Sequence, residues 1–100
     1  MKLGMLVNTD KHLSHIIGMV KAARSRNHEI AIFVMDTGTL LLKNPAFSEL
    51  CLLRGVSMSF CDLSAHKGEV LTEVLPAEIQ CGSQYNNAIM VHESDRVLVF

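Results

Sequence analysis

Five short apolar runs, separated by stretches with helical periodicity, constrain this 100-residue chain more than any other feature. The runs have the length expected of buried strands, and they span Lys2–Val7, Glu29–Met35, Val56–Phe60, Glu78–Cys81 and Arg96–Phe100. Strands that alternate with helices over such short distances are joined by right-handed crossovers, which place the strands in one parallel sheet. The sequence therefore predicts an α/β fold with a five-stranded parallel sheet and helices on both faces.

The segments between the strands carry the signals of helix starts and ends. Asp10 is predicted to cap the first helix, Pro45 to begin the second, and Ser83 to cap the last. Apolar residues in the first segment recur at the three- to four-residue spacing of an amphipathic helix. The predicted helical segments are residues 11–26, 45–53 and 84–94, with a polar turn or short helix over 62–67 and a helical fragment at 69–75.

Composition limits the partners that such a chain takes. Hydrophobic residues make up 49% of the chain and charged residues 19%, so disorder is excluded and some apolar surface is expected to contact another subunit. A net charge of −1 argues against a nucleic-acid partner. No apolar stretch approaches the ~18 residues of a membrane span. We expect one domain over residues 1–100 that forms a homo-oligomer.

The three cysteines, Cys51, Cys61 and Cys81, are an odd number, which disfavours a secreted disulfide framework. The N-terminus also lacks the pattern of a signal peptide. Both observations predict a cytoplasmic protein with free thiols. Cys51 lies on an apolar helical stripe and is interpreted as a core residue.

The candidate site lies where the strands end, because the carboxyl ends of parallel strands form the binding edge of an α/β sheet. Polar or reactive residues follow the first, third and fourth strands there. Cys61 is the candidate catalytic residue and Cys81 the candidate second thiol. The residues expected to line the site are Asn8, Asp10, Asp62, Ser64, His66 and Gly82.

Cys61 stands where a strand meets the start of a predicted helix, and N–H groups at a helix start favour a thiolate. We expect it to react before Cys51 and Cys81. Asp62 follows directly, and its charge is predicted to restrain Cys61; the alternative is that Asp62 caps the helix. A further alternative is that Cys61 only ends a buried strand.

The histidines raise the question of a metal. His12 and His15 are three residues apart on the first helix, and His66 or a cysteine is the available third ligand. No paired-cysteine or His-Glu-x-x-His motif accompanies them. We therefore predict no metal site, and the sequence indicates no cofactor.

Several segments together resemble the DsrE/DsrF-like family, which includes the TusD subunit of the bacterial sulfur relay. The resemblance covers nearly the whole chain, and its carriers are Asn8–Asp10, Gly18 with Lys21–Ala23, Ile32–Asp36 with Gly38, Arg54–Val56 leading to Phe60–Cys61, and Ser94–Phe100. It implies a three-layer α/β/α sandwich and assembly as a trimer, a hexamer or a hetero-hexamer. It also implies that Cys61 carries sulfur as a persulfide and that the strands of Cys61 and Cys81 are neighbours.

Three functions remain open from the sequence. The first is a sulfurtransferase or sulfur carrier that accepts sulfane sulfur at Cys61 from a donor protein and passes it to an acceptor protein. The second is a non-catalytic binding or structural subunit with an inert Cys61 and a small-ligand or partner cleft. The third is a redox pair of Cys61 and Cys81. Exposure of Cys61 and the distance between the two thiols distinguish these functions.

Overall fold

The computed structural model describes residues 1–100 and confirms the parallel sheet, with strand order β4–β3–β2–β1–β5. All four neighbouring strand pairs are parallel. The strands are β1 (Lys2–Val7), β2 (Glu29–Val34), β3 (Val56–Cys61), β4 (Ile79–Gly82) and β5 (Arg96–Val99). The α-helices are α1 (Leu13–Ser25), α2 (Pro45–Ser48), α3 (Asp62–Lys67) and α4 (Gln84–Glu93), with 3₁₀ helices η1 (Asp36–Lys43), η2 (Glu49–Leu52) and η3 (Thr72–Val74).

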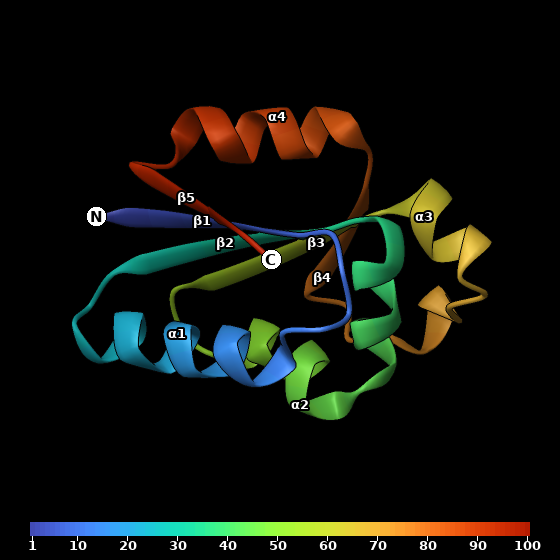
Figure 1. The fold of residues 1–100 in the computed structure, drawn as a ribbon, viewed down its shortest axis with the longest axis horizontal. Helices are drawn as coiled ribbons and strands as arrows, with labels where there is room; N and C mark the ends of the chain where they lie inside the picture. The colour runs from blue at the N-terminus through green and yellow to red at the C-terminus, as the bar shows by residue number, and fades with distance from the viewer.

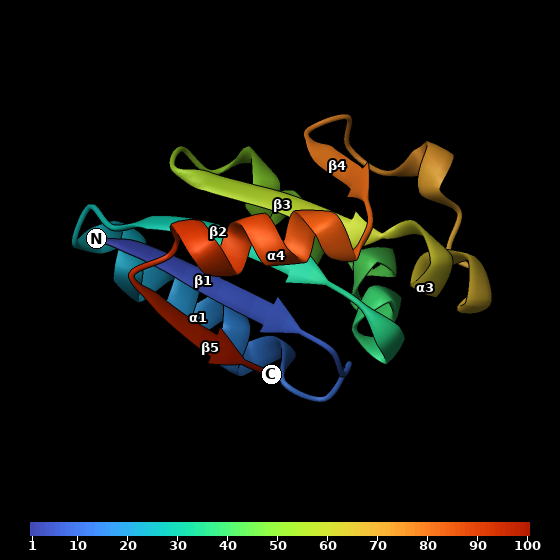
Figure 2. The same cartoon turned by 90° about the horizontal axis from the view of Figure 1, so that it is seen from above.

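The elements form three layers, as Figures 1 and 2 show. Helices α1 and α2 cover one face of the sheet, and α4 lies across the opposite face over β1 and β2. Helix α3 stands at the carboxyl end of β3, outside the two helical layers. No helix of the structure has both the length and the apolar character needed to cross a membrane.

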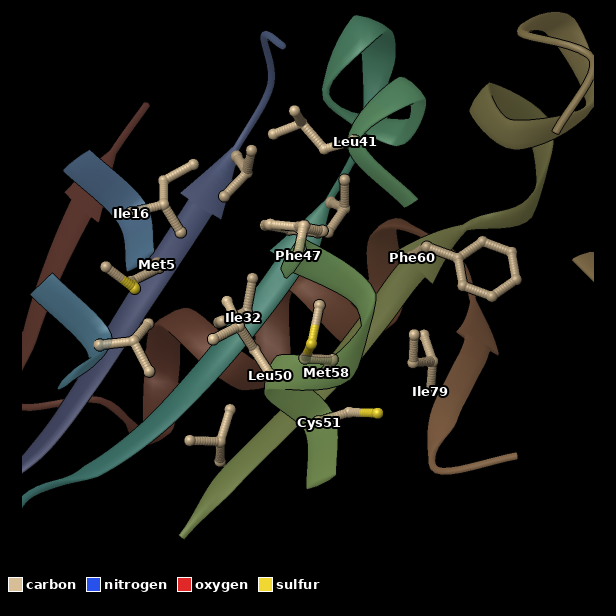
Figure 3. Close-up of a cluster of buried hydrophobic side chains, with 14 of the residues drawn as sticks. Met5, Ile16, Ile32, Leu41, Phe47, Leu50, Cys51, Met58, Phe60 and Ile79 are labelled. Atoms are coloured by element: carbon tan, nitrogen blue, oxygen red, sulfur yellow. The ribbon is translucent and has the colours of Figure 1, made fainter. Parts of the chain in front are cut away.

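The main core lies between the sheet and the α1–α2 layer, where strand and helix side chains interdigitate (Figure 3). Met5 and Ile32 from the central strands meet Ile16 from α1 and Phe47 from α2, and all four are almost wholly buried. Residues of β3 alternate between faces, so Val56, Met58 and Phe60 join this core. A smaller cluster on the α4 face contains Ala31, Phe33, Cys61 and Met90.

The first helix begins later than predicted. His12, not Asp10, occupies the position before the helix, and it makes no side-chain cap hydrogen bond. The N–H groups of Asn8 and Thr9 both donate to the carbonyl of Phe100, at 2.8 and 3.2 Å. These bonds hold the loop against the end of β5, so the chain turns into α1 only after leaving the sheet.

The connection from β2 to β3 also differs from the prediction. Asp36–Lys43, directly after β2, forms the 3₁₀ helix η1, which is not among the predicted helical segments. The predicted helix over 45–53 divides into α2 and η2, and Asn44 caps its start by accepting from the Ala46 N–H at 2.9 Å. Gly38 fits only because it lacks a side chain, since a Cβ there would meet the backbone carbonyl of Val7. The start of η1 therefore lies directly against the carboxyl end of β1.

Candidate functional site

Cys61 is the last residue of β3 and also the position that precedes α3, where a helix cap normally stands. Its backbone is extended, with φ −79° and ψ 115°. The side chain packs with Phe33 and Met90 on the α4 face of the sheet. Only 8% of the residue is exposed, so the sulfur is reached through a cavity rather than from open surface.

That cavity has a volume of about 440 Å³, within the range of small-molecule sites. It opens at the carboxyl ends of β2 and β3, between η1 and α3. Cys61 contributes to its wall, and the other lining residues are Met35, Asp36, Thr37, Thr39, Leu40, Leu63, Ser64, Lys67, Gly68 and Gln84. The cavity therefore brings one thiol together with mixed polar and apolar surroundings.

Thr39 fastens the two walls of this cavity to each other. Its side chain is fully buried, and its hydroxyl donates to the Asp36 carbonyl at 2.8 Å. The same hydroxyl lies 3.5 Å from the Ser64 carbonyl of α3. Asp36 has a positive φ of 50°, a left-handed conformation in which Asp is one of the few common non-glycine residues. Through Thr39, the turn after β2 therefore contacts α3.

Two opposing effects act on the Cys61 thiol. Burial raises its pKa, but hydrogen bonds from the Ser64 hydroxyl and the N–H groups of Ser64 and Leu63 lower it. The Gln84 side chain adds a further lowering hydrogen bond. The donors outweigh burial, so the pKa of Cys61 lies below the ordinary value for a cysteine. Cys61 therefore has a larger thiolate fraction near neutral pH than an unperturbed thiol.

Cys81 has the opposite character. Partial desolvation raises the pKa of its thiol, a hydrogen bond and charge from Asp62 raise it further, and so does the nearby Cys61. Asp62 therefore acts on Cys81, and it is absent from the influences on Cys61. The prediction that Asp62 restrains Cys61 is corrected. Asp62 is also the first residue inside α3 rather than its cap, so the alternative is wrong as well.

The two thiols lie on adjacent strands, as the resemblance implied. Their side chains, however, lie on opposite faces of the sheet. The register of β3 and β4 pairs Phe60 with Cys81 and Cys61 with Gly82. Paired residues in a parallel sheet share a face, so Cys81 follows Phe60 toward the α1–α2 side. Cys61 lies on the α4 side, and both cysteines are free. This arrangement disfavours a Cys61–Cys81 disulfide, and with it the redox-pair hypothesis.

Cys51 is a core residue, as the sequence indicated. It is 7% exposed and belongs to the main cluster beside Leu50 and Met58 (Figure 3). Burial raises the pKa of its thiol, and the charges of Glu78 and Glu49 act in the same direction. Cys51 is therefore protected from reagents and poorly ionised.

The predicted catalytic residue Cys61 lines the cavity, and of the residues predicted to line the site only Ser64 does so. Asp62 and His66 line a separate hollow beside the Glu69–Glu73 segment. Gly82 lies opposite Cys61, where a Cβ would meet the side chain of Asn86. Half-buried Asn8 and exposed Asp10 follow β1, which β2 separates from β3. The loop after β1 thus shares the edge of the sheet but lies outside the cavity.

The cavity residues after β2, above all Asp36, Thr37 and Thr39, are missing from the predicted site, because the prediction considered only the loops after the first, third and fourth strands. The rule that placed sites after the other strands applies equally to this one, so the signal was available. Gln84 belongs to the polar loop after the fourth strand but is not among the predicted lining residues, because its role depends on how the start of α4 meets the end of β3.

The histidines are dispersed. His12 and His15 lie near each other, with ring centroids 6.2 Å apart, and the His12 ring also approaches Phe100. His66 lies on α3, at a different part of the edge. No group of three His, Cys, Asp or Glu side chains is arranged to hold a metal ion.

Fold and cavity together define a small α/β protein with a single thiol in a pocket at the carboxyl edge of its sheet. The DsrE/DsrF-like family model matches residues 1–100, so the chain belongs to this family. That membership supports a protein of the sulfur-relay type in general terms. Among curated proteins, none matches the chain.

Two solved structures share the fold. The YchN protein from E. coli is 14% identical, with a TM-score of 0.76 over 100% of both chains. MTH1491 from Methanobacterium thermoautotrophicum, a protein of unknown function, is 13% identical, with a TM-score of 0.78 over 99% of this chain and 98% of that one. These likenesses show the α/β architecture.

Proposed function

We propose that this protein is a sulfur carrier that accepts a sulfane sulfur at Cys61, holds it as a persulfide and passes it to an acceptor. The observation that carries the proposal is the setting of Cys61, the one cysteine that lines the cavity and has a lowered pKa. Membership of the DsrE/DsrF-like family supports the proposal, because the family is of the sulfur-relay type in general terms.

The transfer needs only a thiolate and a persulfide donor. The Cys61 thiolate attacks the outer sulfur of the donor persulfide, and a new sulfur–sulfur bond forms as the donor's bond breaks. The inner sulfur of the donor leaves with the electron pair as a thiolate. The proton of the outer sulfur stays on that outer sulfur or passes to solvent. Delivery to the acceptor repeats the exchange with the acceptor thiolate as nucleophile. No external oxidant or reductant enters either step.

The cavity supports the storage part of this function. A persulfide extends the cysteine by one sulfur–sulfur bond of about 2 Å, and the cavity offers room for that extension. Because Cys61 is 8% exposed, bulky oxidants and unrelated thiols have restricted access to the stored sulfur. The proposal includes a reducing compartment such as the cytoplasm, donor and acceptor proteins, and assembly of the chain with copies of itself.

The test is the intact mass of the protein after incubation with a low-molecular-weight persulfide. We expect the wild type to gain one sulfur atom and Cys61→Ser to gain none. Cys51→Ser and Cys81→Ser are matched controls, and both are expected to load as the wild type does.

Loading that persists in Cys61→Ser and disappears in Cys81→Ser would overturn the assignment. Absence of loading in every variant, with all of them folded, would favour the non-catalytic binding subunit instead. A second step then tests delivery, since loaded protein mixed with a thiol acceptor is expected to lose the added mass.

A further inference from the structure

Gln84 reaches the cavity from a different element than the other donors around Cys61. Those donors belong to Leu63 and Ser64 of α3, whereas Gln84 is the first residue of α4. The β3–β4 register places Gly82 opposite Cys61, so α4 begins two residues later, beside the end of β3. Gln84 thereby lines the same cavity as Cys61.

The carboxamide of Gln84 is held at both ends. Its Nε2 donates to Met35 Sδ at 3.5 Å, and its Oε1 accepts from Asn87 Nδ2 at 3.2 Å. Asn87 lies one helical turn further along α4, so it occupies the amide oxygen from within the same helix. The NH₂ end points to Met35, which also lines the cavity. A thioether is a weak acceptor, and an amide nitrogen carries two N–H groups, so donation to a second sulfur is available.

We infer that Asn87 is a positioning residue, which keeps the Gln84 amide in the orientation that donates a hydrogen bond to the Cys61 sulfur in its anionic form. The thiolate is thus held from two sides, by α3 and by α4. The lowering effect of the Gln84 side chain on the pKa of Cys61 agrees with this geometry.

For sulfur transfer the inference rests on the proposed function. In a Cys61 persulfide the negative charge moves about 2 Å outward, to the terminal sulfur. The N–H groups at the start of α3 are fixed in the backbone and stay with the inner sulfur. The side-chain donors on the cavity wall, the Ser64 hydroxyl and the Gln84 amide, are the ones that can reach the outer sulfur, and Gln84 does so from the α4 side.

Other charged and titratable groups near Cys61 have to be separated from this effect. They are Asp36 of η1, Lys67 of α3, and Cys81 of β4 with its neighbour Asp62. None of them is altered in the variants of Gln84 and Asn87, so their contribution is common to the whole series.

The experiment measures the rate at which Cys61 reacts with iodoacetamide, a neutral reagent, as a function of pH, with peptide mapping to isolate Cys61. Gln84→Leu removes the donor and is expected to slow the reaction at neutral pH by about threefold to tenfold, the net effect of losing one typical hydrogen bond. The rate at high pH, where the thiol is fully ionised, is expected to stay the same. Asn87→Ala is expected to shift the curve in the same direction by less.

Gln84→Glu keeps the acceptor oxygen for Asn87 but places a negative charge beside the sulfur, so it is expected to slow the neutral-pH reaction more than Gln84→Leu. A carboxylate in the first turn suits the helix dipole, so this variant is expected to fold. Gln80 is an exposed residue of β4, so Gln80→Leu and Gln80→Glu are the matched controls and are expected to leave the Cys61 curve unchanged.

A Gln84→Leu curve that coincides with that of Gln80→Leu would overturn the inference. A rate that falls equally at every pH would overturn it too, since that pattern reports altered access rather than altered ionisation. The alkylation series requires no sulfur transfer. If Cys61 fails to load with sulfur while the series behaves as expected, the proposed function fails and the hydrogen bond stands.

Discussion

At the scale of single residues, the difference in thiol pKa between Cys61 and Cys81 comes from which polar groups face each sulfur. Both thiols are partly desolvated, and desolvation raises the pKa of each. Cys61 receives donors from Ser64 and Gln84, and these reverse the effect of burial. Cys81 faces the carboxylate of Asp62, which raises the pKa of the thiol further. Two cysteines on adjacent strands thereby obtain opposite tendencies to ionise.

Asp62→Asn tests this division directly. The carboxylate raises the pKa of Cys81, so its removal lowers that pKa and increases the thiolate fraction at neutral pH. We expect Cys81 to react with iodoacetamide about threefold faster or more at neutral pH, with little change well above its pKa. The Cys61 curve is expected to stay where it is. Acceleration of Cys61 with no change at Cys81 would restore the role that the sequence suggested for Asp62.

At the scale of elements, the parallel sheet and its helices were predictable because apolar runs and helical spacing mark them locally. The start of α4 was predictable for the same reason, because its capping box uses neighbouring residues. The Ser83 hydroxyl accepts from the Tyr85 N–H, and the Asn86 side chain accepts from the Ser83 N–H. The 3₁₀ helix η1 was not predictable, because its position depends on contact with the end of β1. The direction of Asp62 was equally hidden, since it depends on the register between β3 and β4.

The contact between η1 and β1 can be tested with two glycines that have opposite surroundings. A Cβ at Gly38 would meet the carbonyl of Val7, whereas a Cβ at Gly18 of α1 meets nothing within 4 Å. We expect Gly38→Ala to lower the free energy of unfolding by about 1–3 kcal/mol and to disturb the cavity wall. Gly18→Ala is expected to raise it by about 0.5–1 kcal/mol, because alanine favours a helix interior. Equal effects of both variants in urea denaturation would contradict this account of η1.

At the scale of the whole molecule, the fold leaves considerable apolar surface exposed on its helices and loops. Leu63, Leu71, Val74 and Tyr85 are each more than 60% exposed, in a chain with 49% hydrophobic residues. Contact between copies is the simplest way for a chain this small to cover such surface. We expect light scattering at micromolar concentration to give a mass that is a multiple of 11.1 kDa. A mass of one chain would contradict the predicted homo-oligomer.

The central claim is that sulfur is stored on Cys61 and on no other thiol. The most direct measurement is peptide mapping of the wild-type protein after brief exposure to a limiting amount of persulfide, because all three cysteines then compete in one sample. The account predicts that the added sulfur is found on the peptide that contains Cys61, with Cys51 and Cys81 unmodified. Added sulfur on Cys81, or divided evenly among the three thiols, would contradict it.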